Sequence, residues 1–498
     1  MRASVWLTIA VVAATVAGPA RSVPAAEILV GPDMPVEKAL AAAKPGDVVL
    51  LPDGVHKDLR IVFEAAGQPE KPVTLRAKNP GKCILTGVSN VTIKGRHGVV
   101  EGLVFDQAWG DVIVLFNGAT DCRLTDCAFI ECGRPASPFG RSIDMKSKSQ
   151  RNRVDHCFMQ GNLSQGMGVT VSEPDNQENT DNAFDHNYFR DIVARAGNGQ
   201  ESIQIGQGGL GETKVRAVVE WNLFERASGD PEIISNKSSG NTYRFNTFRD
   251  CKRSELVLRG GHEALVYGNF FFGCKGGVRM HGKRHTVVGN YIEGAERGIL
   301  IPTGSDRYDV SEDCLIAHNT IVNVKKEGIQ VGYAPPAGAP PIERTQPARL
   351  KFLNNLVVSG EGRLMAIDSG TNLAFQGNLV HAIPPTHGTR QADPGLKHEG
   401  IRAVDPGLVK ADGLMRLPPT GSPAQDAAVA VVGFKVTDDI DGQPRDAKPD
   451  VGCDEVSAKP IVRRPLEPKD VGPTWMKGDP SGINRIDSPQ PIPSLKKK

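Results

Sequence analysis

The chain has 498 residues and a formal net charge of +2 at pH 7, and this balance lacks the basic excess that is typical of nucleic-acid-binding proteins. Its 55 glycines and 36 prolines indicate many turns, which argues against a helical bundle or a coiled coil. The length would suit about three ordinary domains of roughly 150 residues, or one repeat fold that grows along a single axis.

Residues 1–26 have the pattern of an export signal. Arg2 precedes an apolar stretch over residues 5–17, and small residues follow it. We therefore expect cleavage between Ala20 and Ala26 and a secreted or periplasmic protein. An N-terminal membrane anchor is the alternative interpretation. The stretch is shorter than the roughly 20 residues that cross a bilayer, and no later segment is long enough, so no membrane partner is expected.

Residues 34–47 are the first segment with helical composition. Their sequence, MPVEKALAAAKPGD, ends at Pro45 and Gly46, which stop a helix. The segments VVLLPDG and PVTLRA follow, and the β-branched residues in them are typical of strands. We therefore expect one short helix near the amino-terminal end, followed by strands.

A degenerate repeat occupies the middle of the chain. Each copy is a short apolar run, then Asn, any residue and a further apolar or aromatic residue, as in VVEWNLF, YRFNTF and TVVGNYI. Most copies lie roughly 21 to 36 residues apart, and a period of this size indicates a solenoid or a propeller. The copies centre on Asn187, Asn222, Asn246, Asn269, Asn290, Asn319 and Asn378, and two earlier ones, at His156 and Cys127, keep the frame with the Asn replaced.

This repeat predicts an all-β fold, namely a single parallel β-helix with the short helix as its amino-terminal cap. The apolar runs are too short for paired helices. A unit of about 23 residues has room for two or three strands rather than the four of a propeller blade. Equivalent positions in a β-helix stack at about 4.8 Å, so the recurring Asn is predicted to form a ladder of hydrogen-bonded amides.

The β-helix is expected to extend over residues 27–458. Within this range, residues 422–455 are predicted to form a last irregular coil. Residues 459–498 contain many prolines and lysines and few apolar residues. This composition predicts an extended C-terminal tail.

The cysteines are expected to be buried thiols. There are nine, which is an odd number, and none forms a CxxC pair. Several lie in apolar runs such as CILTG and TDCAFIEC, where a thiol packs as a small apolar side chain.

One region, residues 198–285, places charged residues inside otherwise apolar strands. Lys237, Arg259 and Arg279 are each separated by about one short coil, and equivalent positions on neighbouring coils lie side by side. These three residues are therefore predicted to form a basic column on one face. A solvated face without catalytic function is the alternative interpretation.

The same region predicts an oxygen-rich site. Asp230 and Glu232 alternate along the strand that leads into Lys237, so their side chains point the same way. With the amide of Asn198 on the preceding coil, they suit a hard cation such as Ca²⁺. The two carboxylates could instead form surface ion pairs with the neighbouring basic groups.

Four segments resemble those of polysaccharide lyase family 6, namely EIISNKSSGNTYRFNTF, LRGG, GGVR and PGDVVLLPDGVH. The resemblance covers roughly residues 30–400. That family contains alginate lyases and chondroitinase B, on a right-handed parallel β-helix. The resemblance therefore implies this fold, an acidic uronate-containing polysaccharide as substrate, most often alginate, and Ca²⁺ as cofactor.

The resemblance also assigns roles to individual residues. It implies that Lys237 is the Brønsted base and that Arg259 is the acid. The residues that match the family's calcium ligands are Asn198, Asp230 and Glu232, and those that match its substrate-binding strand are Arg279 and His281.

Two positions depart from the family's pattern. Asp230 stands where the family usually has Glu, and Gly260 stands where it often has His. Glu201 could supply an additional carboxylate, and His262 or His281 could take the place of the missing His. We therefore include Glu201 and His262 among the expected substrate-binding residues.

The chemistry of β-elimination explains these residue types. The reaction removes the C5 proton of a uronate beside its carboxylate, so a cation must neutralise that carboxylate. The base must be neutral near the working pH, and neighbouring cations lower the pKa of a Lys such as Lys237. Arg259 would assist the departing glycosidic oxygen, although an Arg, with a pKa above about 12, donates protons poorly, and water could deliver the proton.

The main hypothesis is a secreted lyase that cleaves alginate. Chondroitin or dermatan sulfate is the alternative substrate. A uronate C5-epimerase and a non-catalytic carbohydrate-binding β-helix are the alternative functions. No nucleic-acid partner is expected, and the sequence leaves the oligomeric state open.

Overall fold

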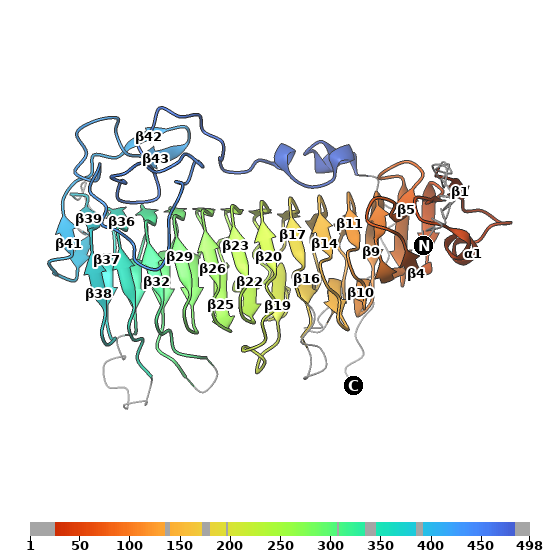
Figure 1. Ribbon diagram of the computed structural model, residues 1–498, viewed down its shortest axis with the longest axis horizontal. Coiled ribbons are helices and arrows are strands. Elements are labelled where there is room, and N and C mark those ends of the chain that lie inside the picture. Colours follow the sequence, from red (N-terminus) through yellow and green to blue (C-terminus); the bar gives the residue numbers. More distant parts are fainter. Residues whose placement is uncertain are drawn as a thin grey trace, which may run out of the picture.

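The computed structural model describes residues 25–134, 140–171, 180–195, 198–305, 308–333, 345–384 and 392–483. Over these residues the chain winds into a right-handed parallel β-helix, an elongated solenoid (Figure 1). The all-β parallel β-helix expected from the repeat is thereby confirmed. Most of the expected export signal and the end of the expected tail, residues 1–24 and 484–498, lie outside the described residues.

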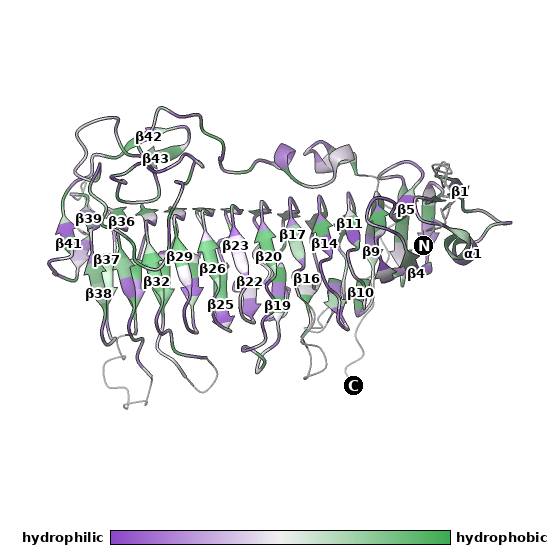
Figure 2. Cartoon of the chain, viewed as in Figure 1, coloured by the Kyte–Doolittle hydropathy of each residue, from purple (hydrophilic) through white to green (hydrophobic). Residues whose placement is uncertain are grey.

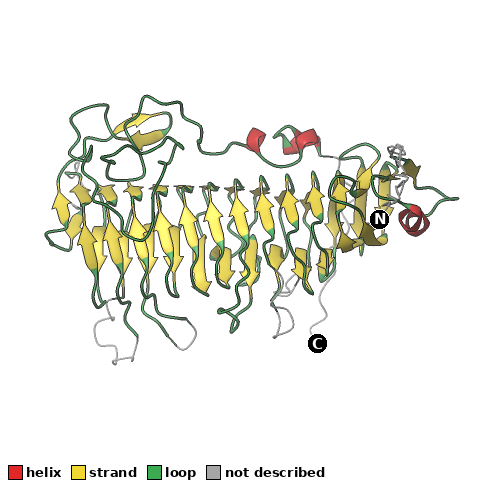
Figure 3. Cartoon of the chain, in the orientation of Figure 1, coloured by secondary structure: helices red, strands yellow, loops and turns green. Residues whose placement is uncertain are grey.

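Three parallel sheets of 14, 13 and 14 strands run along the described solenoid (Figure 3). The first sheet contains β1 (Glu27–Leu29), β2 (Val48–Leu51), β5 (Val73–Ala77), β8 (Gly98–Glu101), β11 (Arg123–Thr125), β14 (Arg153–Asp155), β17 (Ala183–Asp185), β20 (Val218–Glu220), β23 (Thr242–Arg244), β26 (Leu265–Tyr267), β29 (Thr286–Val288), β32 (Leu315–Ala317), β35 (Lys351–Leu353) and β38 (Ala374–Gln376). The second sheet contains β4 (Arg60–Ala66), β7 (Asn90–Arg96), β10 (Val112–Asn117), β13 (Arg141–Lys146), β16 (Gln165–Val169), β19 (Ile203–Gly206), β22 (Glu232–Lys237), β25 (Glu255–Gly260), β28 (Gly276–Met280), β31 (Arg297–Ile301), β34 (Glu327–Val331), β37 (Arg363–Ile367) and β40 (Asp393–Gly395). The third sheet contains β3 (Gly54–Lys57), β6 (Cys83–Gly87), β9 (Leu103–Ala108), β12 (Ala128–Ile130), β15 (Phe158–Gln160), β18 (Tyr188–Arg190), β21 (Leu223–Glu225), β24 (Thr247–Arg249), β27 (Phe270–Phe272), β30 (Tyr291–Glu293), β33 (Thr320–Val322), β36 (Leu356–Ser359), β39 (Asn378–Ala382) and β41 (Ile401–Ala403).

Stacked apolar side chains fill the interior of the solenoid. Most strands are hydrophobic in Figure 2, whereas β22 and β25 also carry hydrophilic residues. The rings of Phe189, Phe224, Phe248 and Phe271 stack face to face on successive coils, with centroids 4.5 to 4.7 Å apart. This spacing equals the distance between paired strands, so one side chain on each coil builds a continuous column.

The predicted asparagine ladder is confirmed. The Nδ2 of each ladder residue donates to the Oδ1 of the next, at 2.9 to 3.0 Å, from Asn187 through to Asn378. Asn355 fills the one long gap in the sequence repeat, between Asn319 and Asn378. At the other end, the N–H of Cys157 donates to Asn187 Oδ1 at 3.0 Å, so Cys157 occupies the ladder position of this coil, and the expected position at His156 was wrong by one residue.

A short helix closes the amino-terminal end of the solenoid, as predicted. Helix α1 (Val36–Ala42) lies inside the expected range of 34–47. Its buried residues Val36 and Ala39 belong to the same apolar core as the first strands. The cap thus removes the apolar interior of the first coil from water.

The segment after β41 differs from the expected last coil. It contains an antiparallel pair, β42 (Val409–Ala411) and β43 (Leu414–Arg416), and three short 3₁₀ helices, η2 (Pro468–Asp470), η3 (Thr474–Met476) and η4 (Pro480–Gly482). Instead of extending the solenoid, it turns back and runs along one side of it (Figure 1).

The reason for this path is the apolar outer face of the third sheet. Phe158 and Tyr188 on that face pack against Leu466, Val471 and Met476 of the returning segment. Burial of such side chains contributes about 25 cal/mol for each Å² removed from water. The part of the expected tail that is described, residues 459–483, therefore lies extended along the β-helix.

The cysteines are as expected, since all nine are free and buried. Cys127 and Cys157 occupy the ladder position on the two coils that precede Asn187, and each Sγ lies 3.3 to 3.4 Å from a backbone carbonyl oxygen. Among the described residues, no helix has the length and apolar character needed to cross a membrane.

Candidate active site

The charged residues singled out in the sequence gather on the outer face of the second sheet, on β22, β25 and β28. Their register differs from the expected basic column. A bulge on β25, in which Arg259 is the extra residue, places Lys237 opposite Gly260 rather than Arg259. Arg279 lies opposite Val257, two residues before Arg259. The three basic side chains therefore approach the site from different rows instead of stacking.

Lys237 is held by polar partners on the neighbouring coil. Its Nζ donates to Gln204 Oε1 at 2.7 Å and lies 3.7 Å from Glu201 Oε1. The Lys237 side chain is 13% exposed. Burial lowers its pKa and outweighs the charges of Glu201 and Glu232, which raise it, while Arg259 and Arg141 make smaller contributions that lower it. The expected direction is therefore present, although burial rather than like charge is its largest cause.

Three buried glutamates occupy successive coils beside this lysine. Glu201 precedes Glu232, and Glu232 pairs directly with Glu255 across β22 and β25. Glu232 lies 3.7 Å from Arg259 and 3.4 Å from Arg279, and it accepts the Ser235 hydroxyl. Burial raises the pKa of Glu201 and of Glu255.

The residues predicted to hold calcium are only partly assembled. Asp230 is buried, and its carboxylate accepts the N–H of Gly199 at 2.9 Å and that of Glu232 at 3.0 Å. Asn198, at the start of the same coil as Glu201, is exposed. Burial raises the pKa of Asp230, and the neighbouring charge of Glu232 adds to this.

The chemistry of this donor set fits a hard cation. The raised pKa values of Glu201 and Asp230 mean that nearby cations do not compensate for the burial of these carboxylates. Carboxylate and amide oxygens are the ligands that Ca²⁺ prefers. Asp230, Glu232 and Asn198 are therefore retained as candidate ligands.

A different acidic cluster could also hold a metal ion. Asp439, Asp441 and Asp454 bring one oxygen each within 4.8 Å of the others, and this is the sole such His, Cys, Asp or Glu group in the part of the chain that the structure describes. Arg416 already contacts two of them, since its Nη1 donates to Asp441 and, at 3.0 Å, to Asp454. Asp439 accepts N–H groups from Asp441 and Gln443. The Arg416 guanidinium thus already supplies positive charge to this acidic cluster.

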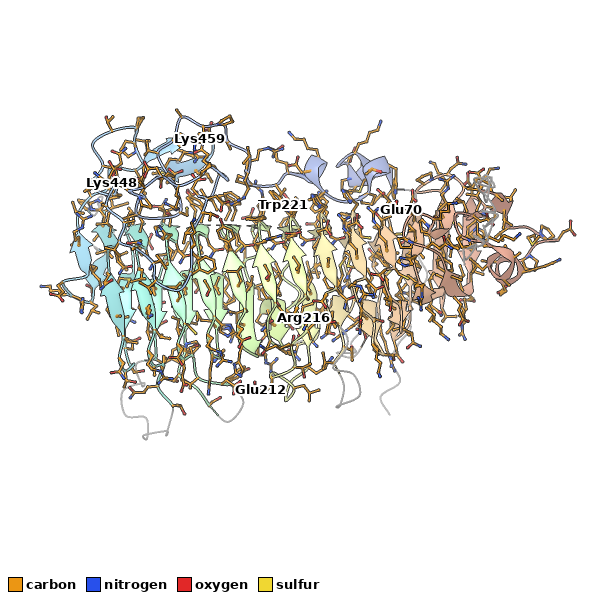
Figure 4. All side chains as sticks on the ribbon, viewed as in Figure 1. Glu70, Glu212, Arg216, Trp221, Lys448 and Lys459 are labelled. Carbon is orange, nitrogen blue, oxygen red and sulfur yellow. The ribbon has the colours of Figure 1, made fainter. Side chains whose placement is uncertain are left out.

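A pocket of about 600 Å³ opens above the lysine. Lys237, Arg259 and His262 line it together with the loop 207–212 and Tyr308. It lies on the side of the solenoid away from the C-terminal segment: Figure 4 shows Glu212 of this loop at one edge and Lys448 and Lys459 at the other. The pocket therefore stays clear of the segment that covers the third sheet.

The two candidate histidines have different surroundings. His262 lines the pocket, and its Nε2 lies 2.8 Å from Glu212 Oε1. His281 is buried behind the pocket, where its ring stacks on Tyr308 at 4.8 Å, and burial lowers its pKa to about 3. The Arg259 guanidinium also lies over the Tyr308 ring, 5.3 Å from its centroid.

Comparison with known proteins identifies the family. A family model described as Chondroitinase B matches residues 31–396, which is most of the chain. The chain belongs to this family, polysaccharide lyase family 6. No curated protein sequence matches the chain.

Solved structures of the same family resemble this one. The PL6 family alginate lyase AlyGC has 27% sequence identity and a TM-score of 0.70, over 88% of this chain and 59% of that one. A mannuronic acid specific polysaccharide family 6 lyase from human gut microbiota has 27% identity and a TM-score of 0.64, over 76% and 91%. The PL6 lyase Pedsa3628 from Pseudopedobacter saltans, at 24% identity and a TM-score of 0.62, shares the fold over 90% and 99%. The chain thus spans about three fifths of the length of AlyGC.

The candidate site contains residues that sequence analysis missed. Gln204 contacts Lys237, and Gln165 donates to Gln204 Oε1 at 2.9 Å. Gln204 could have been found from the alternation in SIQIG, which puts a polar residue between two core isoleucines. Tyr308 and Glu212 lie in loops between coils, where no periodic pattern marks a residue.

Proposed function

We propose that this chain is an exported lyase that cleaves alginate by β-elimination, with Lys237 as the base. The observation that carries the proposal is the buried Lys237 amine, which lines a pocket of about 600 Å³ beside Arg259. The family and its alginate lyase structures support an acidic polysaccharide as the substrate. Export rests on the apolar segment at residues 5–17.

In this mechanism the uronate carboxylate is neutralised before the C5 proton leaves. Arg279 and Arg259, each within 4 Å of Glu232, are the cations at hand, and charge that develops on the carboxylate in the transition state strengthens their interaction with it. A calcium ion held by Asn198, Asp230 and Glu232 would supply further positive charge. Such stabilisation grows as the proton departs, so it lowers the barrier rather than only binding substrate.

Lys237 then takes the C5 proton in its neutral form. Burial lowers its pKa, so a larger fraction of the amine is neutral near neutral pH than for an exposed lysine. The C4–O bond breaks as the C4–C5 double bond forms, and the departing oxygen is stabilised by Arg259. Because an Arg holds its protons tightly, a water molecule supplies the proton to that oxygen.

A glycosaminoglycan is the second candidate substrate. The matching family model carries the description Chondroitinase B, which favours chondroitin or dermatan sulfate as the alternative. The same base and the same carboxylate chemistry would apply, because these polymers also contain uronates. The two candidates therefore differ only in which polymer fits the pocket.

The test is an assay of the purified full chain on alginate, polymannuronate, polyguluronate, chondroitin sulfate and dermatan sulfate. Ultraviolet absorbance follows the new double bond, with and without a calcium chelator. The alginate substrates should give signal, and Lys237→Ala should abolish it, whereas the matched control Lys351→Ala, an exposed lysine on the first sheet, should not. Signal on the sulfated polymers alone would move the assignment to the second candidate. No signal on any uronate polymer would refute a lyase.

A further inference from the structure

The polar contacts of Lys237 continue across four strands of the second sheet. Arg141 on β13 donates from Nε to Gln165 Oε1 on β16 at 2.6 Å. Gln165 Nε2 donates to Gln204 Oε1 on β19 at 2.9 Å, and Lys237 Nζ on β22 donates to the same oxygen at 2.7 Å. Arg141, Gln165 and Gln204 are each at most 6% exposed. The chain of contacts is therefore buried and ends at the proposed base.

The orientation of each side-chain amide in this series of contacts is fixed by the groups that donate to its oxygen. Arg141 has no acceptor, so Gln165 must turn its oxygen toward it. The Gln165 amide nitrogen then faces Gln204 and Glu201, to whose Oε2 it also donates at 2.9 Å. Gln204 turns its own nitrogen to the carbonyl of Gly206 at 3.0 Å, which leaves its oxygen for Lys237. If the Gln204 amide were flipped, its own N–H groups would face the donors Gln165 Nε2 and Lys237 Nζ, and neither donor would have an acceptor there.

We propose that Gln204 is a positioning residue for Lys237: its side-chain oxygen holds one N–H of the amine and leaves the nitrogen lone pair facing the pocket. This inference rests on the proposed lyase function with Lys237 as base. A neutral amine has two N–H bonds and one lone pair. Gln204 takes one N–H, and Glu201, which lies just before β19, has its Oε1 3.7 Å from the same nitrogen.

The value of such a contact lies in the flexibility of lysine. A Lys side chain loses up to about 2 kcal/mol of rotamer entropy when it is fixed. A base that is misplaced by about 1 Å can lose about 100-fold in rate. Gln204 fixes Lys237 before substrate arrives and adds no charge, so it does not add to the rise in the lysine pKa that the carboxylate of Glu201 causes.

The test compares Gln204→Met with Gln330→Met in the full chain. Gln330 lies on β34 in the same row of the second sheet, reached through Ser235, Val257, Arg279 and Leu300. It is buried like Gln204, and its Nε2 donates to Asp368 at 2.8 Å. Gln204→Met should lower kcat about 10- to 100-fold with KM within about twofold of wild type. Gln330→Met should leave kcat unchanged.

A third variant separates positioning from a structural role. Gln204→Glu keeps an oxygen acceptor for Lys237 but adds a negative charge that favours the ammonium form. The acidic limb of its kcat–pH profile should therefore move to higher pH, and its kcat should approach that of wild type above that limb. A merely structural role for Gln204 would not move the limb.

Three results would overturn the inference. They are a Gln204→Met enzyme with kcat within twofold of wild type, a rise in KM with kcat unchanged, and a Gln204→Glu enzyme as slow as Gln204→Met at every pH. If circular dichroism shows that Gln204→Met does not fold, Gln165→Met tests the same tether one step back, and an unchanged kcat there also overturns it. Inactive wild type, or active Lys237→Ala, would instead refute the proposed function itself.

Discussion

The asparagine ladder allows a quantitative test of what holds the solenoid together. Asn246 lies in the middle of it and is fully buried. Its Oδ1 accepts the backbone N–H of Asn222 at 3.0 Å and the side-chain amide of Asn222 at 2.9 Å. Its Nδ2 donates to the carbonyls of Val219 and Arg244 at 2.9 and 3.1 Å and to Asn269 Oδ1 at 3.0 Å. Asn246→Ala removes all five bonds.

The expected loss of stability follows from these contacts. A typical hydrogen bond contributes about 1 kcal/mol net, so five give an upper figure of about 5 kcal/mol. The backbone N–H of Asn222 loses its acceptor, and an unsatisfied buried donor costs about 1 to 3 kcal/mol. We therefore expect Asn246→Ala to destabilise the protein by about 3 to 5 kcal/mol. In a solenoid each coil contacts only its neighbours, so the loss should be concentrated in the adjacent coils.

Hydrogen–deuterium exchange with mass spectrometry measures this effect locally, and urea denaturation measures it globally. The matched control is Asn90→Ala, since Asn90 is half-buried on β7 and its side chain donates to Val88 O at 3.2 Å. The control should change stability by less than about 0.5 kcal/mol. Equal exchange of the coils around Asn222 and Asn269 in the two variants would show that the ladder does not stabilise the solenoid.

Four further predictions concern the site and its surroundings. The acidic limb of kcat should lie below pH 10.5, the ordinary lysine value, because burial lowers the pKa of Lys237, and a pH profile with a limb at or above that value would contradict it. Chelation should lower activity, and added Ca²⁺ should raise the melting temperature of wild type but not of Asp230→Ala; an equal rise in both would exclude Asp230 as a ligand. Glu212→Gln should raise KM several-fold with kcat unchanged, because it weakens the 2.8 Å contact between Glu212 Oε1 and His262 Nε2 that ties the pocket loop to His262, and steady-state kinetics checks this. Burial lowers the pKa of His318 to about 3, so below pH 6.5 the unfolded state binds more protons than the folded state. The contribution of His318 to stability is therefore full above pH 6.5 and is lost as the pH falls toward 3. Denaturation midpoints of His318→Asn should depend less on pH over this range than those of wild type.

The site shows how far sequence patterns reach. Lys237, Arg259 and Arg279 were placed on one face correctly, because strands one coil apart pair side by side. Their exact row was wrong, since Arg259 is the extra residue of a bulge on β25, opposite the step from Asn236 to Lys237, and no periodicity marks such a residue. Gln204 was missed although the alternation in SIQIG marks it, and Tyr308 was missed because no periodic pattern marks a residue in a loop between coils.

The sequence by itself determined the β-helix, its amino-terminal cap, the asparagine ladder and the residue types of the site. These follow from patterns that repeat once per coil, and each coil needs only its own strands and its neighbours to form. The tertiary structure alone decided the path of residues 404–483 along the third sheet and the network from Arg141 to Lys237. Both depend on which distant surfaces meet, and that is set by the lengths of the turns and loops between coils rather than by any local period.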